Sequence, residues 1–71
     1  MSDNFFYKNI GKKISQIREK KNISQEKLSF KSGVDRTYIC RIEKGFANPS
    51  IRIIEKIASA LNVSIYLLIK N

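Results

Sequence analysis

The sequence predicts one compact, all-α domain built from five short helices. Its 71 residues leave room for a single domain, which we place over residues 1–71. Apolar residues recur every three or four positions along almost the whole chain, which is the spacing of helices with one buried face. Ser, Asp, Asn and Gly separate these segments at positions where helices prefer to begin and end.

The first helix is predicted over about residues 8–21. Its buried stripe consists of Phe6, Ile10, Ile14 and Ile17. Asn22 is the expected stop, because Asn tolerates the left-handed backbone conformation that ends many helices. Ser24 then begins a second helix, predicted to about residue 31, with Glu26 in the first turn where a negative charge suits the helix dipole.

The third helix follows a short break. Gly33 lies where the backbone needs a positive φ, which glycine adopts without steric cost. Asp35 can cap a helix over residues 36–44, and Gly45 ends it. The inward-facing residues of this helix are Ile39 and Ile42.

The last two helices are predicted from the same signals. Either Asn48 or Ser50 caps the fourth helix, and Asn62 ends it. Its stripe comprises Ile51, Ile54, Ala58 and Leu61, widened by Ile53 and Ile57. Ser64 caps a final short helix over residues 65–69.

The charge balance favours an acidic partner. The chain has 14 basic and 6 acidic side chains, a net charge of +8. Nucleic acid is the first candidate for such a chain. A membrane surface would require an amphipathic helix with a basic polar face, and simple solubility is a further explanation for excess lysine.

Cysteine and histidine usage excludes several kinds of site. One cysteine, Cys40, and no histidine allow neither an intrachain disulfide, nor a Cys/His zinc cluster, nor a His-based catalytic dyad. We see no paired carboxylates on one helix face and no glycine-rich phosphate loop, so we expect no enzyme, metal or cofactor. The sequence also has no signal peptide and no apolar run long enough for a bilayer, which indicates the cytoplasm.

Residues 24–44 match a helix-turn-helix unit. Two short helices that cross at a steep angle require a small residue at the crossing, here Ser29, and a glycine in the turn four residues later, here Gly33. The apolar anchors on the inner side are Leu28, Val34, Ile39 and Ile42. Each residue is common alone, but the joint match at this spacing is a fairly specific signal.

The chain resembles the Cro/repressor-type helix-turn-helix family, which includes the lambda-repressor-like DNA-binding domains. The resemblance covers about residues 10–68. Its motifs are Ile14-x-x-Ile17-Arg18, Ser24-Gln25-x-x-Leu28, Gly33-Val34, Tyr38-Ile39-x-x-Ile42-Glu43-x-Gly45, Pro49-Ser50 and Ile57-Ala58-x-x-Leu61-x-Val63-Ser64. Within this family, residues 35–43 are most similar to restriction–modification controller proteins. Four features depart from the family pattern: Ser29 in place of the usual alanine, Cys40 in place of a frequent serine, Ala47 at a position often basic, and the aromatic start Phe5-Phe6-Tyr7.

The resemblance implies DNA contacts from the third helix, which enters the major groove in this family. The expected base contacts are Arg36, Thr37 and Arg41. The expected contacts to the DNA backbone are Gln25, Tyr38, Lys44, Asn48 and Lys27. Arg36 and Arg41 have the alternative of being solvated helix charges, and Tyr38 the alternative of covering the edge of the core. Arg18 and Glu43 occupy positions that form a structural ion pair in the family, and Val63, Tyr66 and Leu67 are the candidates for a symmetric dimer interface.

These implications lead to a functional hypothesis. The chain is expected to be a homodimeric transcriptional regulator that binds double-stranded DNA at a pseudo-palindromic operator in its own promoter, as a restriction–modification controller does, with no small-molecule effector. One alternative is a phage or plasmid repressor of the same fold. Another is a helix-turn-helix module that binds protein, such as an antitoxin or antirepressor, because a fold does not determine function. RNA binding is a third option, less favoured because the aromatic residues lie at core spacing.

Overall fold

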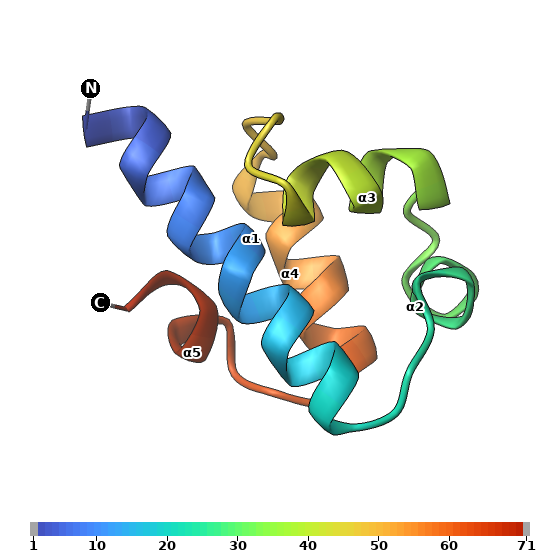
Figure 1. Cartoon of the computed structure of the whole chain (residues 1–71). Coiled ribbons are helices and arrows are strands. Elements are labelled where there is room, and N and C mark those ends of the chain that lie inside the picture. Colours follow the sequence, from blue (N-terminus) through green and yellow to red (C-terminus); the bar gives the residue numbers. More distant parts are fainter. Residues whose placement is uncertain (1, 71) are drawn as a thin grey trace.

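Five helices and no strands make up the part of the chain that the computed structural model describes, which is the backbone of residues 2–70 and the side chains of residues 5–70. The helices are α1 (Ser2–Lys20), α2 (Gln25–Ser32), α3 (Arg36–Glu43), α4 (Ile51–Leu61) and α5 (Ile65–Ile69). Figure 1 shows α1 running diagonally through the molecule, with α3 along one side and α5 on the other. The predicted all-α fold with a helix-turn-helix at the second and third helices is confirmed.

The first four helices end close to the Asn and Gly residues that the sequence predicts as helix ends. Asn22 and Asn62 both have the left-handed backbone conformation, with φ of 58° and 60°. Gly33 and Gly45 also have the left-handed conformation, with φ of 76° and 79°. All four positions had been predicted as ends or breaks, because Asn and Gly tolerate this conformation best.

Hydroxyl and carboxylate caps begin the four helices from α2 onward. Ser24, Asp35 and Ser64 accept hydrogen bonds from backbone N–H groups of α2, α3 and α5. The choice between Asn48 and Ser50 is resolved in favour of Ser50, whose Oγ accepts from the backbone N–H of Ile53 at 3.2 Å. Each such cap stabilises its helix by about 1 kcal/mol.

The first helix is longer than predicted, since it begins at Ser2 rather than near residue 8. Residues 2–10 contain neither glycine nor proline, so nothing in the local sequence stops the helix. Tyr7 also packs against the core from this added segment. Contact with the core therefore extends α1 toward the N-terminus, where no cap was evident in the sequence.

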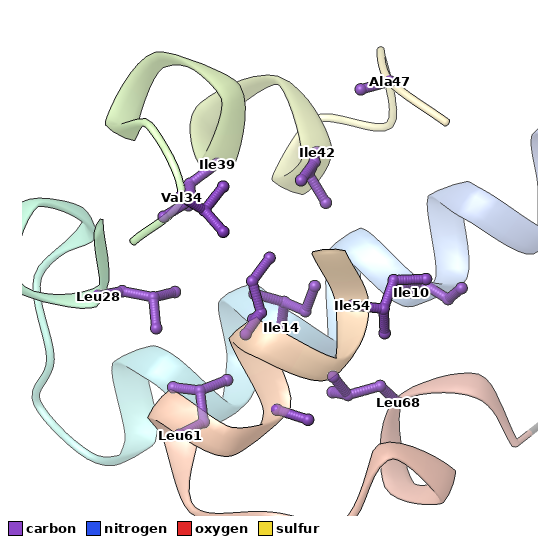
Figure 2. Close-up of a cluster of buried hydrophobic side chains, with 12 residues drawn as sticks. Ile10, Ile14, Leu28, Val34, Ile39, Ile42, Ala47, Ile54, Leu61 and Leu68 are labelled. Atoms are coloured by element: carbon purple, nitrogen blue, oxygen red, sulfur yellow. The ribbon is translucent and has the colours of Figure 1, made fainter. Parts of the chain in front are cut away.

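The core lies where α1, α3 and α4 meet, with Leu28 of α2 and Leu68 of α5 closing it (Figure 2). Its members are Ile10, Ile14, Leu28, Val34, Ile39, Ile42, Ala47, Ile54, Ile57, Ala58, Leu61 and Leu68. The prediction that Phe6 and Ile51 belong to buried stripes is wrong, because Phe6 is 38% exposed and Ile51 is 54% exposed. Both lie toward the first turns of their helices, where neighbouring elements do not cover the stripe.

Gly11 lets α1 and α3 approach each other closely. A Cβ built at Gly11 would overlap the backbone carbonyl oxygen of Ile42 and lie 3.2 Å from Cα of Glu43. Because both neighbours are backbone atoms, no side-chain rotation relieves the overlap. A glycine in the middle of α1 therefore sets the distance at which the C-terminal end of α3 packs on this helix.

Candidate nucleic-acid interface

The turn between α2 and α3 is fixed by short hydrogen bonds. The Ser29 hydroxyl donates to the backbone carbonyl of Val34 at 2.6 Å, and the Val34 N–H donates to the Ser32 hydroxyl at 3.1 Å. Asp35 then caps α3 by accepting from the Thr37 N–H at 3.0 Å. These bonds hold the start of α3 at a defined angle to α2. The serine that replaces the usual alanine thus adds a bond across the turn.

The α3 helix separates residues that fold the protein from residues that face solvent. Ile39 and Ile42 are completely buried, whereas Arg36 and Thr37 are exposed at the first turn of the helix. Lys44, just after the helix, is also exposed. The outward face of α3 thus presents donors and positive charge, as the sequence predicts for a helix that enters a DNA groove.

Arg41 and Tyr38 lie on α3 near the loop that follows it. The Arg41 guanidinium donates from Nη2 to the backbone carbonyl of Phe46 at 3.0 Å, so it leans over the loop that follows the helix. Tyr38 is half-buried and packs against the core edge. Asn48 is exposed in the same loop. These three residues line one pocket, and Arg36 is not among its lining residues.

The two candidate contact residues in the first turn of α2 differ in their exposure to solvent. Lys27 is exposed, whereas Gln25 is half-buried and its side-chain Nε2 donates to Oε1 of Glu43 at 2.9 Å. An amide nitrogen carries two N–H donors, so one remains for a phosphate. The bond to Glu43 also joins the first turn of α2 to the end of α3, which sequence spacing did not reveal.

Arg18 and Glu43 form the ion pair expected from the resemblance. Arg18 Nε donates to Glu43 Oε2 at 2.7 Å, and Arg18 Nη2 donates to Oε1 at 3.1 Å. The third nitrogen, Nη1, donates to the backbone carbonyl of Ile23 at 2.8 Å. The two side chains are only 12% and 7% exposed. The pair therefore fixes the end of α3 to α1 and to the chain just before α2.

The electrostatics of Arg18 agree with this geometry. The hydrogen bond to Glu43 raises the pKa of Arg18 above its ordinary value, although burial alone would lower it. The charges of Glu43 and Glu19 raise it further. Arg18 therefore remains a cation at any pH at which the protein is folded.

The candidate dimer residues lie on and next to α5. Tyr66 is 71% exposed and Leu67 is 53% exposed, while Val63 is half-buried against the core. Leu67 also lines an apolar groove with Ile17 of α1. Large apolar side chains are therefore available to a partner on this side of the molecule.

One further basic residue, Lys8 of α1, lies beside Tyr38 and Arg41 and was not among the predicted contacts. No spacing in the sequence connects Lys8 with residues thirty and more positions later. In the described part of the chain, no cluster of His, Cys, Asp and Glu could hold a metal ion. Nor does any helix over residues 2–70 have the length and apolar character needed to cross a bilayer.

Fold and site together define a helix-turn-helix protein whose second helix in the unit presents an exposed basic face. The chain belongs to the helix-turn-helix family, whose conserved pattern matches residues 14–68. It is a DNA-binding transcriptional regulator of this family.

Individual relatives agree with the family. The chain is 54% identical over 54 residues to the control protein C.BamHI of Bacillus amyloliquefaciens, covering 75% of this chain and 67% of that protein. It is 39% identical over 61 residues to the transcriptional regulator SinR of Bacillus subtilis, covering 84% of this chain but only 55% of SinR. The chain thus spans about half the length of SinR.

Solved structures show the same fold. The restriction–modification controller protein C.AhdI from Aeromonas hydrophila superimposes with a TM-score of 0.85 at 37% identity, covering 87% of this chain and 94% of that one. The wild-type controller protein C.Esp1396I superimposes with a TM-score of 0.84 at 38% identity, covering 93% and 90%. The predicted likeness to controller proteins is confirmed.

Proposed function

We propose that this protein is a homodimeric controller of a restriction–modification system that binds a pseudo-palindromic operator at its own promoter. The observation that carries the proposal is the division of α3, with Ile39 and Ile42 in the core and Arg36 and Thr37 exposed at its N-terminal turn. The control protein C.BamHI and the controllers C.AhdI and C.Esp1396I support the regulatory role, because they cover most of this chain.

Base recognition is assigned to the N-terminal turn of α3. In helix-turn-helix proteins this turn enters the major groove and faces the base edges. The guanidinium of Arg36 can donate two parallel hydrogen bonds to O6 and N7 of guanine, which discriminates against other bases by about 1–3 kcal/mol. Thr37 offers a methyl group to thymine or a hydroxyl to a neighbouring base or phosphate.

Positioning is assigned to groups that contact the sugar–phosphate backbone. The first turn of α2, with Gln25 and Lys27, presents backbone N–H groups and the positive end of a helix dipole to a phosphate. Lys44 adds charge after α3, and Asn48 adds a donor from the next loop. If a dimer neutralises about eight phosphates, the logarithm of the binding constant falls against the logarithm of salt concentration with a slope of about −7.

Dimerisation is assigned to Val63, Tyr66 and Leu67. One domain of this size buries too little DNA surface for tight specific binding, whereas two domains contact two half-sites. Half-sites about 34–36 Å apart place both α3 helices on one side of the duplex. The exposed apolar side chains of α5 provide the symmetric surface that such a dimer needs.

A gel-shift titration with DNA from directly upstream of the protein's own gene tests the proposal. Excess random-sequence competitor and two salt concentrations separate specific from nonspecific binding. We expect a specific, salt-sensitive shift that Arg36→Ala abolishes and that Lys20→Ala, at an exposed lysine of α1 outside the assigned contacts, leaves intact. Weak binding that the competitor removes entirely would contradict operator recognition at this promoter and favour a protein-binding module.

A further inference from the structure

An open pocket lies between the N-terminal half of α1, the α3 helix and the loop that follows α3. Lys8 lines it from α1, Tyr38 and Arg41 line it from α3, and residues 45–48 complete it. Figure 1 shows this loop directly after α3, on the same side of the molecule as that helix, and Gly45 in the loop lies next to Lys8 of α1. The pocket therefore includes Tyr38 and Arg41 of the same helix whose first residue is Arg36.

The position of Lys8 depends on Gly45. A Cβ at Gly45 would lie 2.6 Å from Cγ of Lys8 and 3.5 Å from its Cα, so any larger residue would displace the lysine. Gly45 also has a φ of 79°, which other residues rarely adopt. The aliphatic stem of Lys8 thus rests against the loop, while the residue as a whole remains exposed.

The pocket has the donor set of an anion site. Its lining includes two cations, Lys8 and Arg41, and no carboxylate. Arg41 uses one guanidinium nitrogen on the carbonyl of Phe46, which holds its charge over the loop. A guanidinium has five N–H donors, so donors remain for a ligand, and the Asn48 amide adds more.

The place of the pocket along α3 indicates which anion it receives. With a rise of 1.5 Å per residue, Arg41 lies about 7.5 Å beyond Arg36 along the helix axis. When the first turn of α3 is among the base edges, its other end crosses out of the groove over the sugar–phosphate backbone. A backbone phosphate is the anion that this end of α3 meets.

We propose that the pocket binds a DNA backbone phosphate and that Lys8 supplies a cation to it, with Arg41 and Asn48 as the other donors. This inference rests on the proposed DNA binding and extends the contact surface to α1. It assigns Arg41 to the phosphate backbone in place of a base edge. Because a phosphate contact carries no sequence information, Lys8 contributes equally to specific and nonspecific affinity.

The test compares Lys8→Met with Lys20→Met in fluorescence-anisotropy titrations of a labelled random-sequence duplex over a series of salt concentrations. Methionine keeps the aliphatic stem over Gly45 and removes only the charge. Lys20 is exposed on the same helix and does not line the pocket, so it is the matched control. We expect Lys8→Met to make the salt slope shallower by about 0.9 per bound protomer. Lys20→Met should leave the slope unchanged.

The remaining outcomes are distinct. The same loss of affinity for Lys8→Met on promoter DNA would support the phosphate contact, whereas a loss on promoter DNA alone would overturn it in favour of a base contact. A slope equal to that of the wild type would overturn the assignment of Lys8 while leaving the proposed function intact. No binding of the wild type to any duplex would overturn both. Displacement of the duplex by inorganic phosphate at constant ionic strength, weakened by Lys8→Met, would support the proposal, because free phosphate and the DNA backbone would then compete for the same pocket.

Discussion

Removal of the Glu43 carboxylate is expected to destabilise the whole domain. Glu43 accepts two hydrogen bonds from Arg18 and one from Gln25, and its side chain is 7% exposed. Glu43→Ala leaves the Arg18 guanidinium, 12% exposed, without its buried partner, and the loss of one partner of a buried pair costs about 3–5 kcal/mol. Total stabilities run at about 0.05–0.15 kcal/mol per residue, which gives roughly 4–11 kcal/mol for 71 residues, so the loss is a large fraction.

Thermal and urea unfolding followed by circular dichroism measure this loss. In a domain of this size each 1 kcal/mol lowers Tm by about 4–8 °C, so Glu43→Ala should lower Tm by at least about 12 °C. Glu19 is the matched control, because its carboxylate lies 3.7 Å from the same Arg18 but is 69% exposed. Glu19→Ala should cost under about 1 kcal/mol.

A double-mutant cycle separates pairing from burial. Arg18→Met combined with Glu43→Leu removes both charges, so the double variant should lose clearly less stability than the two single variants added together. Additive losses, or a loss for Glu43→Ala no greater than for Glu19→Ala, would refute the view that this pair holds α3 in place.

Three other substitutions test the packing and the interface. Gly11→Ala should cost about 3 kcal/mol in urea unfolding, because its Cβ overlaps the Ile42 carbonyl, whereas Gly33→Ala, with no atom within 4 Å of its Cβ, should cost only the left-handed backbone penalty of about 1 kcal/mol. Equal losses would contradict the close approach of α1 and α3. Leu67→Asn should shift the protein from dimer to monomer in sedimentation equilibrium without loss of helicity, and Phe30→Asn, on the 89% exposed Phe30 of α2, should not. Unchanged dimerisation of Leu67→Asn would place the interface elsewhere.

Features decided by neighbouring residues could be predicted from the sequence. Asn62 stops α4 and Asp35 caps α3 through their own backbone and side-chain preferences, so these ends were correct. The start of α1 was not, because Tyr7 contacts the core from a segment without a capping signal. Ile51 fitted the apolar stripe of α4 but is exposed, since burial depends on which elements cover a helix as well as on its periodicity.

The candidate site also combines features that local sequence predicts with contacts that only the packing of the helices creates. The exposure of Thr37 follows from the helical spacing of Ile39 and Ile42, which fixes the opposite face of α3. Arg36 lies three residues before Ile39, so spacing alone does not predict its exposure; it is exposed as the first residue of the helix. The bond between Gln25 and Glu43 joins positions 18 residues apart, and the approach of Lys8 to the loop joins still more distant ones. Such contacts depend on how helices pack, and no spacing in one sequence indicates them.

The separation of buried and exposed positions on α3 has a consequence for evolution. Ile39 and Ile42 carry the packing, whereas Arg36 and Thr37 contribute almost nothing to the core. Surface substitutions usually change stability by less than about 0.5 kcal/mol, so the exposed positions can vary while the domain still folds. Duplicated copies of such a gene can therefore diverge on their exposed α3 positions while the scaffold stays unchanged.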